Sequence, residues 1–545
     1  MSFSTQVSGQ IIDIQGNRIF GGIIKVINGK IVEIVEKASM PDRLLLPGFI
    51  DAHIHIESSM LTPYEFARKA LVHGTVATVS DPHEIANVCG MDGVNYMLEN
   101  AKDARLKFHF GAPSCVPATT FETAGAELTP ADVEKLLQRK DIFYLSEMMN
   151  YPGVLFNDPV VKEKIAIAKK LNKPIDGHAP GLTGSDAIKY ISAGITTDHE
   201  CFTKAEALHK LKNGMKILIR EGSAARNFEA LHELISEYPE MVMLCSDDKH
   251  PDELMLGHIN LLVKRALEKG HNLFDVLRCA CINPVHHYGM EVGLIRVGDP
   301  ADFIVIDNST NFNVLETYIN GEMVAENGSC ILNQKQHHII NNFNCKEKSP
   351  NDFQILANGK IMNVMEAIDG QLITQPSKFP VNEMGGCAVA DVEKDILKIA
   401  VVNRYRDAKP ALAFIKNFNL KSGAIASTVA HDSHNIIAIG VDDESISRAV
   451  NLLIKNKGGL SVVNNQDEIV LPLPIAGLMS DLSCDEIGNL YSILDKKVKS
   501  MGCTLRAPYM TLSFMALLVI PKLKLSDLGL FDGEKFCFVE LMETS

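Results

Sequence analysis

The chain has 545 residues, of which 46% are hydrophobic, and this is too long for one ordinary domain. Its 53 Lys and Arg residues against 67 Asp and Glu residues give a net charge of −14, which argues against nucleic acid as the main partner. The longest late apolar run, MALLVI at 515–520, is far too short to cross a bilayer, so no membrane partner is expected.

The cysteines and the amino-terminal residues indicate the compartment. Twelve cysteines are present without a single CxxC pair, and many lie within apolar runs. Cys279 and Cys281 form a lone CxC pair, which is more typical of packing than of metal binding. The first residues lack the basic start and apolar run of a signal peptide. We therefore expect buried free thiols and a cytoplasmic location.

Two blocks of short strands flank a long central segment. Residues 1–44 contain two apolar runs separated by Asn28-Gly29, and residues 291–335 contain a similar pair separated by Asn320-Gly321. Both dipeptides are hairpin signals. Blocks so far apart can share a sheet if the segment between them folds by itself. We predict one small β-sandwich built from both flanks.

The central segment, residues 45–290, alternates apolar runs with amphipathic helical stretches. The eight apolar runs are FIDAHIHIE, ATVSDPHE, FHFGAPSC, IFYLSEMMN, PIDGHAPG, ITTDHE, KILIREGSAARN and MVMLCSDDKHP. Repeated strand–helix units of this length predict a parallel sheet, and eight of them predict a TIM-like (β/α)8 barrel. Residues 336–350 are predicted to be a linker, and residues 351–545 a C-terminal α/β domain. The expected fold class is therefore α/β.

The first of these runs alternates ligand-type and apolar side chains. Asp51, His53 and His55 occupy alternate positions, so on a strand they share one face. In a barrel the outer strand face packs on helices, whereas the inner face can be polar near the carboxyl end. Two imidazoles on one strand face can bind a metal ion, although a hydrogen-bonded pair of core histidines would explain HxH equally well.

Later strands also end in ligand-type residues, namely Glu147, His178, His199 and Asp247. Their common position at the carboxyl ends favours a metal site over coincidence. With His53 and His55 they form a set large enough for two divalent ions, bridged by Glu147. Nitrogen and oxygen ligands without thiolate suit Zn²⁺, Mn²⁺ and Fe²⁺. The expected chemistry is metal-assisted hydrolysis, with Asp247 accepting a proton from the attacking water and passing it to the leaving group. Asp248, the next residue on an extended strand, is expected to point to the other side.

These residues also carry a resemblance to a known family. PGFIDAHIHIESS resembles the strand-one signature of the amidohydrolase superfamily, and His178, His199 and Asp247 match its ligands on strands five, six and eight. Within the superfamily the sequence is most similar to the bacterial adenine deaminase family. The matching stretches run nearly end to end: SDPHEIANVCG, LSEMMN, IDGHAPGL, TDHE, SDDKHPD, VAHDSHNIIAIG and LPLPIAGLMSD.

The resemblance implies a reaction and a substrate. Metal-activated hydroxide would attack C6 of adenine, giving hypoxanthine and ammonia in purine salvage, with two ions that are Mn²⁺ or Fe²⁺, or else Zn²⁺. Glu147 stands where many binuclear members carry a carboxylated lysine. His178 is followed by Ala-Pro-Gly, without the glutamate of the adenosine deaminase branch, so the free base is expected. We also expect a homo-oligomer, a dimer.

The residues that handle the purine are less well defined. Glu84 and Glu200 are candidates for the acid that protonates the ring. His83, Ser223, Arg226 and Asn227 are candidates for holding the base, although structural roles would explain each of these residues equally well.

The polar stretch at 430–435, AHDSHN, is open to three interpretations: a solvated loop, a cap over the barrel mouth, or an accessory metal site. Two rival functions also stay open, a hydantoinase-like hydrolase of cyclic amides and a non-catalytic scaffold.

Overall fold

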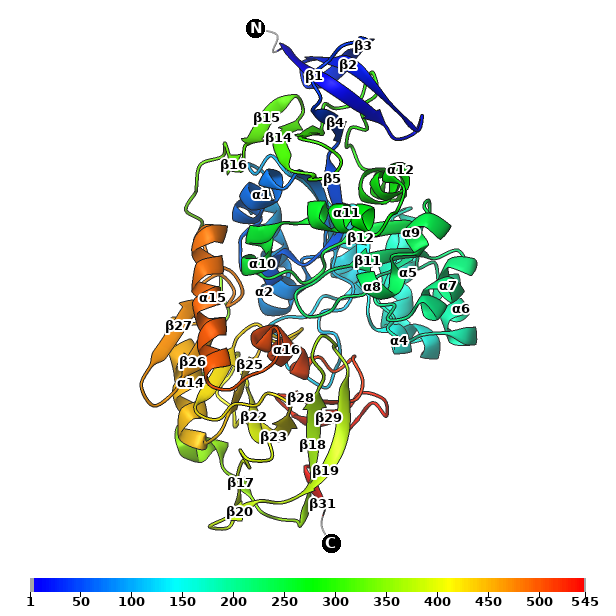
Figure 1. Cartoon of the computed structure of the whole chain (residues 1–545). Coiled ribbons are helices and arrows are strands. Elements are labelled where there is room, and N and C mark those ends of the chain that lie inside the picture. Colours follow the sequence, from blue (N-terminus) through cyan, green and yellow to red (C-terminus); the bar gives the residue numbers. More distant parts are fainter. Residues whose placement is uncertain (1–3, 544–545) are drawn as a thin grey trace.

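The computed structural model describes residues 4–543. Its elements form a small sheet at one end of the molecule, a ring of parallel strands in the middle and a second sheet region at the other end, which contains the carboxyl terminus (Figure 1). We propose these three parts as the domains of the chain, with boundaries near those expected from the sequence.

Both flanks of the central segment contribute to the small sheet. Its strand order is β16-β15-β14-β13-β4-β1-β2-β3. Strand β4 joins the flanks, because it pairs with β1 on one side and with β13 on the other, where Phe303 lies opposite Pro47. The sheet curls around its own core, since the Ile31 N–H donates to the Asp299 carbonyl just before β13. The strands are β1 (Ser4–Asp13), β2 (Arg18–Ile27), β3 (Lys30–Glu36), β4 (Leu44–Pro47), β13 (Phe303–Ile306), β14 (Val314–Ile319), β15 (Glu322–Glu326) and β16 (Ser329–Cys330).

The central strands form a closed barrel. Two parallel sheets are present, in the orders β5-β6-β7-β8-β9 and β10-β11-β12. The Thr196 N–H donates to the Ile175 carbonyl and joins them on one side, and the Asp247 N–H donates to the His53 carbonyl on the other. The TIM-like barrel predicted from eight strand–helix units is therefore confirmed. Its strands are β5 (Phe49–Ile54), β6 (Thr75–Ser80), β7 (Lys107–Ala112), β8 (Tyr144–Met148), β9 (Ile175–Gly177), β10 (Thr197–Asp198), β11 (Lys216–Arg220) and β12 (Val242–Cys245).

Helices cover the outside of the barrel. The first begins where the Thr62 hydroxyl accepts from the Glu65 N–H and Pro63 occupies the first turn, and it ends before Gly74, whose φ is +79°. The helices are α1 (Pro63–Val72), α2 (His83–Ala101), α3 (Pro130–Leu137), α4 (Tyr151–Phe156), α5 (Pro159–Lys170), α6 (Gly184–Ser192), α7 (Lys204–Lys212), α8 (Phe228–Leu231), α9 (Leu234–Glu237), α10 (Pro251–Leu256), α11 (Ile259–Glu268), α12 (Leu273–Leu277) and α13 (Asn283–Tyr288).

The carboxyl-terminal region is built on a larger, mostly antiparallel sheet. Its order is β19-β18-β23-β22-β25-β24-β26-β27, with β31 also paired to β18. The strands are β17 (Ile355–Leu356), β18 (Ile361–Ala367), β19 (Thr374–Pro380), β20 (Glu383–Met384), β21 (Cys387–Ala388), β22 (Ile396–Val402), β23 (Ala411–Lys416), β24 (Ala424–Ser427), β25 (Ile436–Gly440), β26 (Gly459–Val463), β27 (Glu468–Pro472), β28 (Leu523–Ser526), β29 (Gly529–Asp532), β30 (Cys537–Phe538) and β31 (Met542–Glu543). Its helices are α14 (Asp443–Asn456), α15 (Cys484–Ser500) and α16 (Pro508–Ser513).

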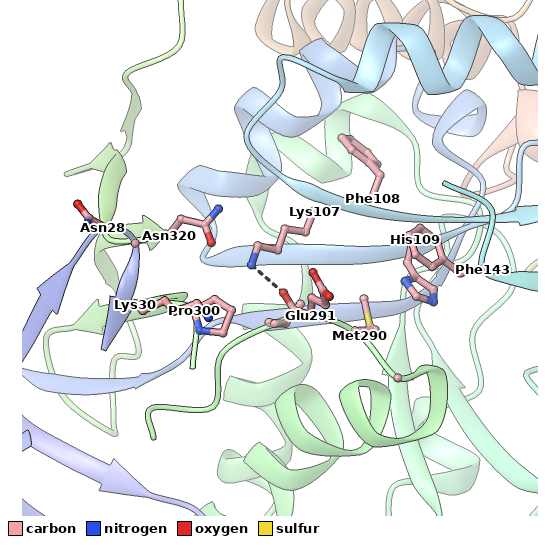
Figure 2. Close-up of a pocket in the computed structure, with 13 residues that line it drawn as sticks. Asn28, Lys30, Lys107, Phe108, His109, Phe143, Met290, Glu291, Pro300 and Asn320 are labelled. Carbon is pink, nitrogen blue, oxygen red and sulfur yellow. Dashed lines mark hydrogen bonds between the residues drawn. The ribbon is translucent and has the colours of Figure 1, made fainter. Parts of the chain in front are cut away.

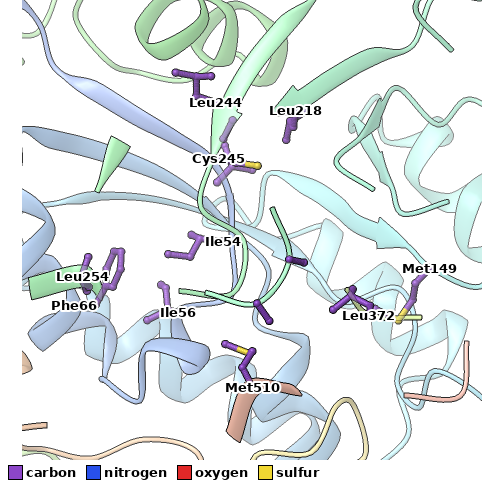
Figure 3. Packing of buried hydrophobic residues seen from close by; sticks show 14 of the residues in the cluster. Ile54, Ile56, Phe66, Met149, Leu218, Leu244, Cys245, Leu254, Leu372 and Met510 are labelled. Carbon is purple, nitrogen blue, oxygen red and sulfur yellow. The ribbon is translucent and has the colours of Figure 1, made fainter. Parts of the chain in front are cut away.

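This region packs against the barrel through apolar side chains. Leu372 and Met510 belong to the same buried cluster as Ile56 and Met149, which follow barrel strands (Figure 3). Burial of such side chains removes apolar surface from water and holds the two parts together. The contact lies at the carboxyl ends of the barrel strands, where active sites form in this fold.

One hollow lies at the opposite end of the barrel. It has a volume of about 770 Å³ and lies between the small sheet and the start of β7. Figure 2 shows Lys107, whose ammonium donates to the Glu291 carbonyl, and the ring of His109 on that lining. The amino ends of the strands lie here, so this hollow is separate from the predicted site. None of the helices within residues 4–543 is long and apolar enough to cross a membrane.

Candidate metal centre and catalytic pocket

His53 and His55 lie at the carboxyl end of β5, buried inside the barrel. Their Nε2 atoms are 3.1 Å apart, and their rings meet edge to face. The alternation in the sequence therefore corresponds to an inward-facing pair. Asp51 shares the strand but belongs to another network, because its carboxylate accepts from the Ser246 N–H and lies 2.7 Å from His258 Nε2.

Glu147 lies between this pair and two further histidines. Its Oε1 is 3.2 Å from His55 Nε2, and its Oε2 is 2.8 Å from His178 Nδ1 and 3.2 Å from His199 Nε2. Burial alone would raise the pKa of the Glu147 carboxyl. The imidazoles of His178, His199 and His55 outweigh burial and hold that pKa well below its ordinary value. A single ionised carboxylate thus contacts both histidine groups.

Asp247 completes the cluster from the end of the last barrel strand. Its Oδ1 lies 3.4 Å from His55 Nε2 and 3.6 Å from His53 Nε2. Its backbone is left-handed, with φ at 55°, and it pairs with residue 54 of β5. The peptide groups of Asp247 therefore close the barrel while its carboxylate faces the histidines.

Its neighbour Asp248 differs from the expectation of an outward-facing side chain. Strand β12 ends at Cys245, and the left-handed turn at Asp247 interrupts the alternation, so Asp248 also lines the cavity. Its Oδ1 accepts from the Ser58 hydroxyl at 2.5 Å. Burial and the charge of Asp247 raise the pKa of Asp248 to about 6.

The six predicted ligands fit a divalent metal centre. All are buried, and their nitrogen and oxygen atoms converge without any thiolate. His178 Nε2 is buried and has no hydrogen-bond partner within residues 4–543. A buried imidazole nitrogen is costly to leave unpaired, so this donor set is chemically suited to a cation.

Arg220 is a part of the site that the sequence analysis missed. Its guanidinium is completely enclosed at the end of β11, with Nη1 donating to Asp247 Oδ2 at 2.6 Å and Nη2 to Glu200 Oε2 at 3.0 Å. Burial lowers the pKa of a guanidinium, but these two carboxylates raise that of Arg220. A charged residue ending the apolar run KILIR was the available signal, as it was for Glu147.

His83 and Glu84 begin helix α2 beside the cluster. His83 Nδ1 is 3.0 Å from Asp81 Oδ2 and 3.6 Å from Glu147 Oε1. Both oxygens of Glu84 contact imidazoles of the carboxyl-terminal region: Oε1 is 2.5 Å from His431 Nδ1, and Oε2 contacts His434 Nε2.

The stretch at 430–435 is therefore a buried part of the site, and the solvated-loop interpretation is wrong. His431 and Asp432 line the same cavity as the metal cluster. The structure thus favours a cap over the barrel mouth, formed by residues far away in the sequence.

The cavity between these groups is small, about 20 Å³. It is lined by His55, His83, Glu84, Glu147, Met149, His178, His199, Glu200, Asp247, Asp248, Leu372, His431, Asp432, Phe514 and Leu517. The lining residues from the C-terminal region, here called the cover, are Leu372, His431, Asp432, Phe514 and Leu517. Lys524 stabilises the cover from outside, because its buried ammonium donates to the carbonyls of Leu372 at 2.6 Å and Phe514 at 2.8 Å.

Comparison with known proteins agrees with this geometry. Residues 44–324 match the amidohydrolase family, and residues 371–537 match the adenine deaminase C-terminal domain. An adenine deaminase of Salinibacter ruber is 52% identical over 99% of both chains. That of Sulfurovum sp. is 54% identical over 98% of this chain and 99% of its own, and that of Methanosarcina acetivorans is 52% identical over 98% of both. The chain belongs to the adenine deaminase family of amidohydrolases.

The cover of the cavity comes from the C-terminal region. Leu372, His431, Asp432, Phe514 and Leu517 all lie within the region matched by the adenine deaminase C-terminal domain. The barrel provides the histidines and carboxylates of the cluster. The adenine deaminase C-terminal domain therefore contributes directly to the pocket.

Three residues predicted to hold the base are not brought to this pocket. Over residues 4–543, its lining contains neither Ser223 nor Arg226 nor Asn227. The Ser223 hydroxyl and the Arg226 guanidinium both donate to Glu253. The Asn227 amide donates to the His199 carbonyl, and its oxygen accepts from the Arg220 N–H. The loop after β11 turns toward α10, so these side chains support the site from behind.

Proposed function

We propose that this chain hydrolyses adenine to hypoxanthine and ammonia. The observation that carries the proposal is the combination of about 50% identity to adenine deaminases over the whole chain with a buried His/Asp/Glu cluster under the C-terminal cover. A cyclic-amide hydrolase of the hydantoinase kind is not favoured, because the cover matches the adenine deaminase C-terminal domain. The buried ligand set also argues against a non-catalytic scaffold.

The cluster is proposed to hold two divalent ions, Mn²⁺ or Fe²⁺, with Zn²⁺ as the alternative. His53, His55 and Asp247 would bind one ion, His178 and His199 the other, and Glu147 would bridge them. The contacts of both Glu147 oxygens with histidines from both groups support this division. When bound, such ions supply the Lewis acidity that makes water a nucleophile at neutral pH.

The proton has a proposed route through Asp247. Its carboxylate would accept a proton from the attacking water and return it to the departing amine, while the second proton of that water ends on the ring nitrogen N1, so that adenine and water become hypoxanthine and ammonia. Arg220 supports this role, because it holds Oδ2 at 2.6 Å and leaves Oδ1 toward the histidines. Glu200 is proposed to act mainly through Arg220, with which its carboxylate is paired.

The experiment that tests this function compares adenine, adenosine, hydantoin and dihydrouracil as substrates of metal-loaded protein, with metal content measured on the same sample. Ammonia release is measured for the two purines, and ring opening is measured for the two cyclic amides. We expect rapid turnover of adenine and little of the other three compounds. Equal turnover of adenosine would refute the base-specific pocket, and preference for a cyclic amide would refute adenine deamination.

The compartment and the assembly are also proposals. All twelve cysteines lie in the described part of the chain and are unpaired there, which supports a reducing compartment, the cytoplasm. We propose a homodimer, to be tested by light scattering of the purified enzyme.

A further inference from the structure

One imidazole from the C-terminal region lines the cavity and has a ring nitrogen without a hydrogen-bond partner in the described part of the chain. His431 is 2% exposed, and its ring lines the pocket. Among residues 4–543 its Nε2 atom has no hydrogen-bond partner. A buried polar atom without a partner is costly, and the cost is removed when a ligand supplies one.

The other face of the ring is firmly held. His431 Nδ1 donates to Glu84 Oε1 at 2.5 Å, and the ring of Phe514 stacks on it with centroids 4.4 Å apart and planes 14° apart. These two contacts define both the position and the plane of the imidazole. The direction in which the Nε2 atom points is therefore fixed.

Glu84 is in turn oriented by His434. The Ala430 N–H donates to His434 Nδ1 at 3.2 Å, so that nitrogen carries no proton and the proton resides on Nε2, which donates to Glu84. A metal ligand must present a bare nitrogen, so this arrangement argues against an accessory metal ion between Glu84, His431 and His434. The three side chains form a carboxylate–histidine support instead.

We propose that His431 Nε2 forms a hydrogen bond with a ring nitrogen of the purine, and that Glu84 and His434 position it for that contact. The inference rests on the proposed function and extends it, because it assigns a substrate-binding residue to the C-terminal region. Glu84 becomes a positioning residue, since both of its oxygens are already accepting hydrogen bonds.

The electrostatics agree with this assignment. Burial lowers the pKa of His431, but the carboxylates of Glu84 and Asp248 outweigh it and raise that pKa to about 9. Such an imidazolium has an N–H at both nitrogens, and the ring nitrogens of adenine that lack hydrogen accept hydrogen bonds. Burial also raises the pKa of Glu84, yet His431 and His434 hold it well below its ordinary value, so Glu84 stays ionised and accepts hydrogen bonds rather than supplying a proton.

The test uses a substitution that separates the two ring nitrogens. In His431→Asn, the amide group can still donate to Glu84 from near the Nδ1 position, but nothing replaces Nε2. His250→Asn is the matched control, because His250 is a buried histidine near the same interface that does not line the pocket. We expect His431→Asn to lose about 10- to 100-fold in kcat/KM for adenine, the effect of one charge-assisted hydrogen bond, with normal metal content.

Deazapurines distinguish contact from a structural effect. Dissociation constants of 1-deaza-, 3-deaza- and 7-deazaadenine are measured for the wild-type and variant enzymes. The loss caused by His431→Asn should disappear for the one analogue that lacks the contacted nitrogen. Equal losses for adenine and all three analogues, or no loss at all, would overturn the assignment.

Two further measurements keep the result decisive. If His431→Asn melts well below His250→Asn, then the dissociation constants are measured for His431→Gln with the same analogues. Its amide lies near the Nε2 position and can keep the purine contact, so this variant should still bind adenine more tightly than the one analogue that lacks the contacted nitrogen. The wild-type enzyme is assayed for ammonia release first. Failure there would refute the proposed function, whereas the dissociation constants would still decide whether His431 contacts the purine.

Discussion

Arg220 is the residue whose removal should disturb the pocket most without removing a predicted ligand. It is 1% exposed and joins Asp247 to Glu200. In Arg220→Met the side chain keeps much of its apolar bulk but loses the guanidinium. Both carboxylates would then be buried without their main counter-charge.

The size of the effect follows from that burial. Breaking a buried ion pair by removing one partner costs about 3–5 kcal/mol, because an uncompensated charge remains. Burial raises the pKa of Asp247, and Arg220 is the largest influence lowering it. Loss of Arg220 should therefore raise the pKa of Asp247. Because Asp247 has to be ionised to accept a proton, the acidic limb of kcat/KM should move to higher pH.

The assay compares three variants by melting temperature, metal content and the pH profile of ammonia release from adenine. Arg265→Met is the matched control, since its side chain is 33% exposed and pairs with Glu221 and Glu229. Such a partly exposed ion pair contributes only about 0–1 kcal/mol to the free energy of unfolding. Arg220→Lys should recover little, because one ammonium cannot replace a fork that spans two carboxylates. Equal melting temperatures for Arg220→Met and Arg265→Met, with unshifted pH profiles, would refute the reasoning.

Four other substitutions test separate parts of the molecule. Glu147→Gln should lower the metal content per chain, because a neutral amide cannot balance the charge of two ions, and unchanged content would contradict the bridge. Asp247→Asn should keep most of its metal and lose about 10²- to 10⁴-fold in turnover, since an amide ligates but accepts no proton. Asp248→Asn should instead change mainly KM, because Asp248 lines the cavity and is held by Ser58. Metal loss in this variant would show that Asp248, rather than Asp247, is the metal ligand. Burial lowers the pKa of Lys524 to about 7, whereas a lysine in the unfolded chain titrates at about 10.4. Between these two pH values the unfolded chain binds one more proton than the folded chain. The free energy of unfolding therefore rises with pH across this window. Lys524→Met should remove that rise from melting temperatures measured across this window.

Much of the barrel and the positions of its candidate ligands could be predicted because the relevant signals are local. A strand with period-two alternation shows which of its side chains share a face, and this located His53 and His55. Glu147, His178 and His199 could be assigned since each follows an apolar run. Carboxyl ends of parallel strands meet at one end of a barrel, so these residues had to converge.

The rest depended on backbone directions that the sequence does not display. At Asp247 a left-handed residue interrupts the alternation, and the predicted orientation of Asp248 was wrong for that reason. The Ser223–Asn227 loop follows a barrel strand, as the ligands do, but ion pairing of Arg226 with Glu253 turns it away from the pocket. Propensity gives no sign of where such a loop leads.

The contact between Glu84 and the two histidines of the C-terminal region was the least accessible feature of all. The partners are about 350 residues apart, and only the completed fold brings them within hydrogen-bond distance. Neither side suffices alone: an isolated barrel would expose a buried carboxylate to water, and an isolated C-terminal region would leave two imidazoles without their acceptor. Because burying a charge is favourable only with a partner, the docking of the two parts and the formation of the pocket are coupled. A family that attaches this C-terminal region to an amidohydrolase barrel thereby closes a site that the barrel alone would leave open to water.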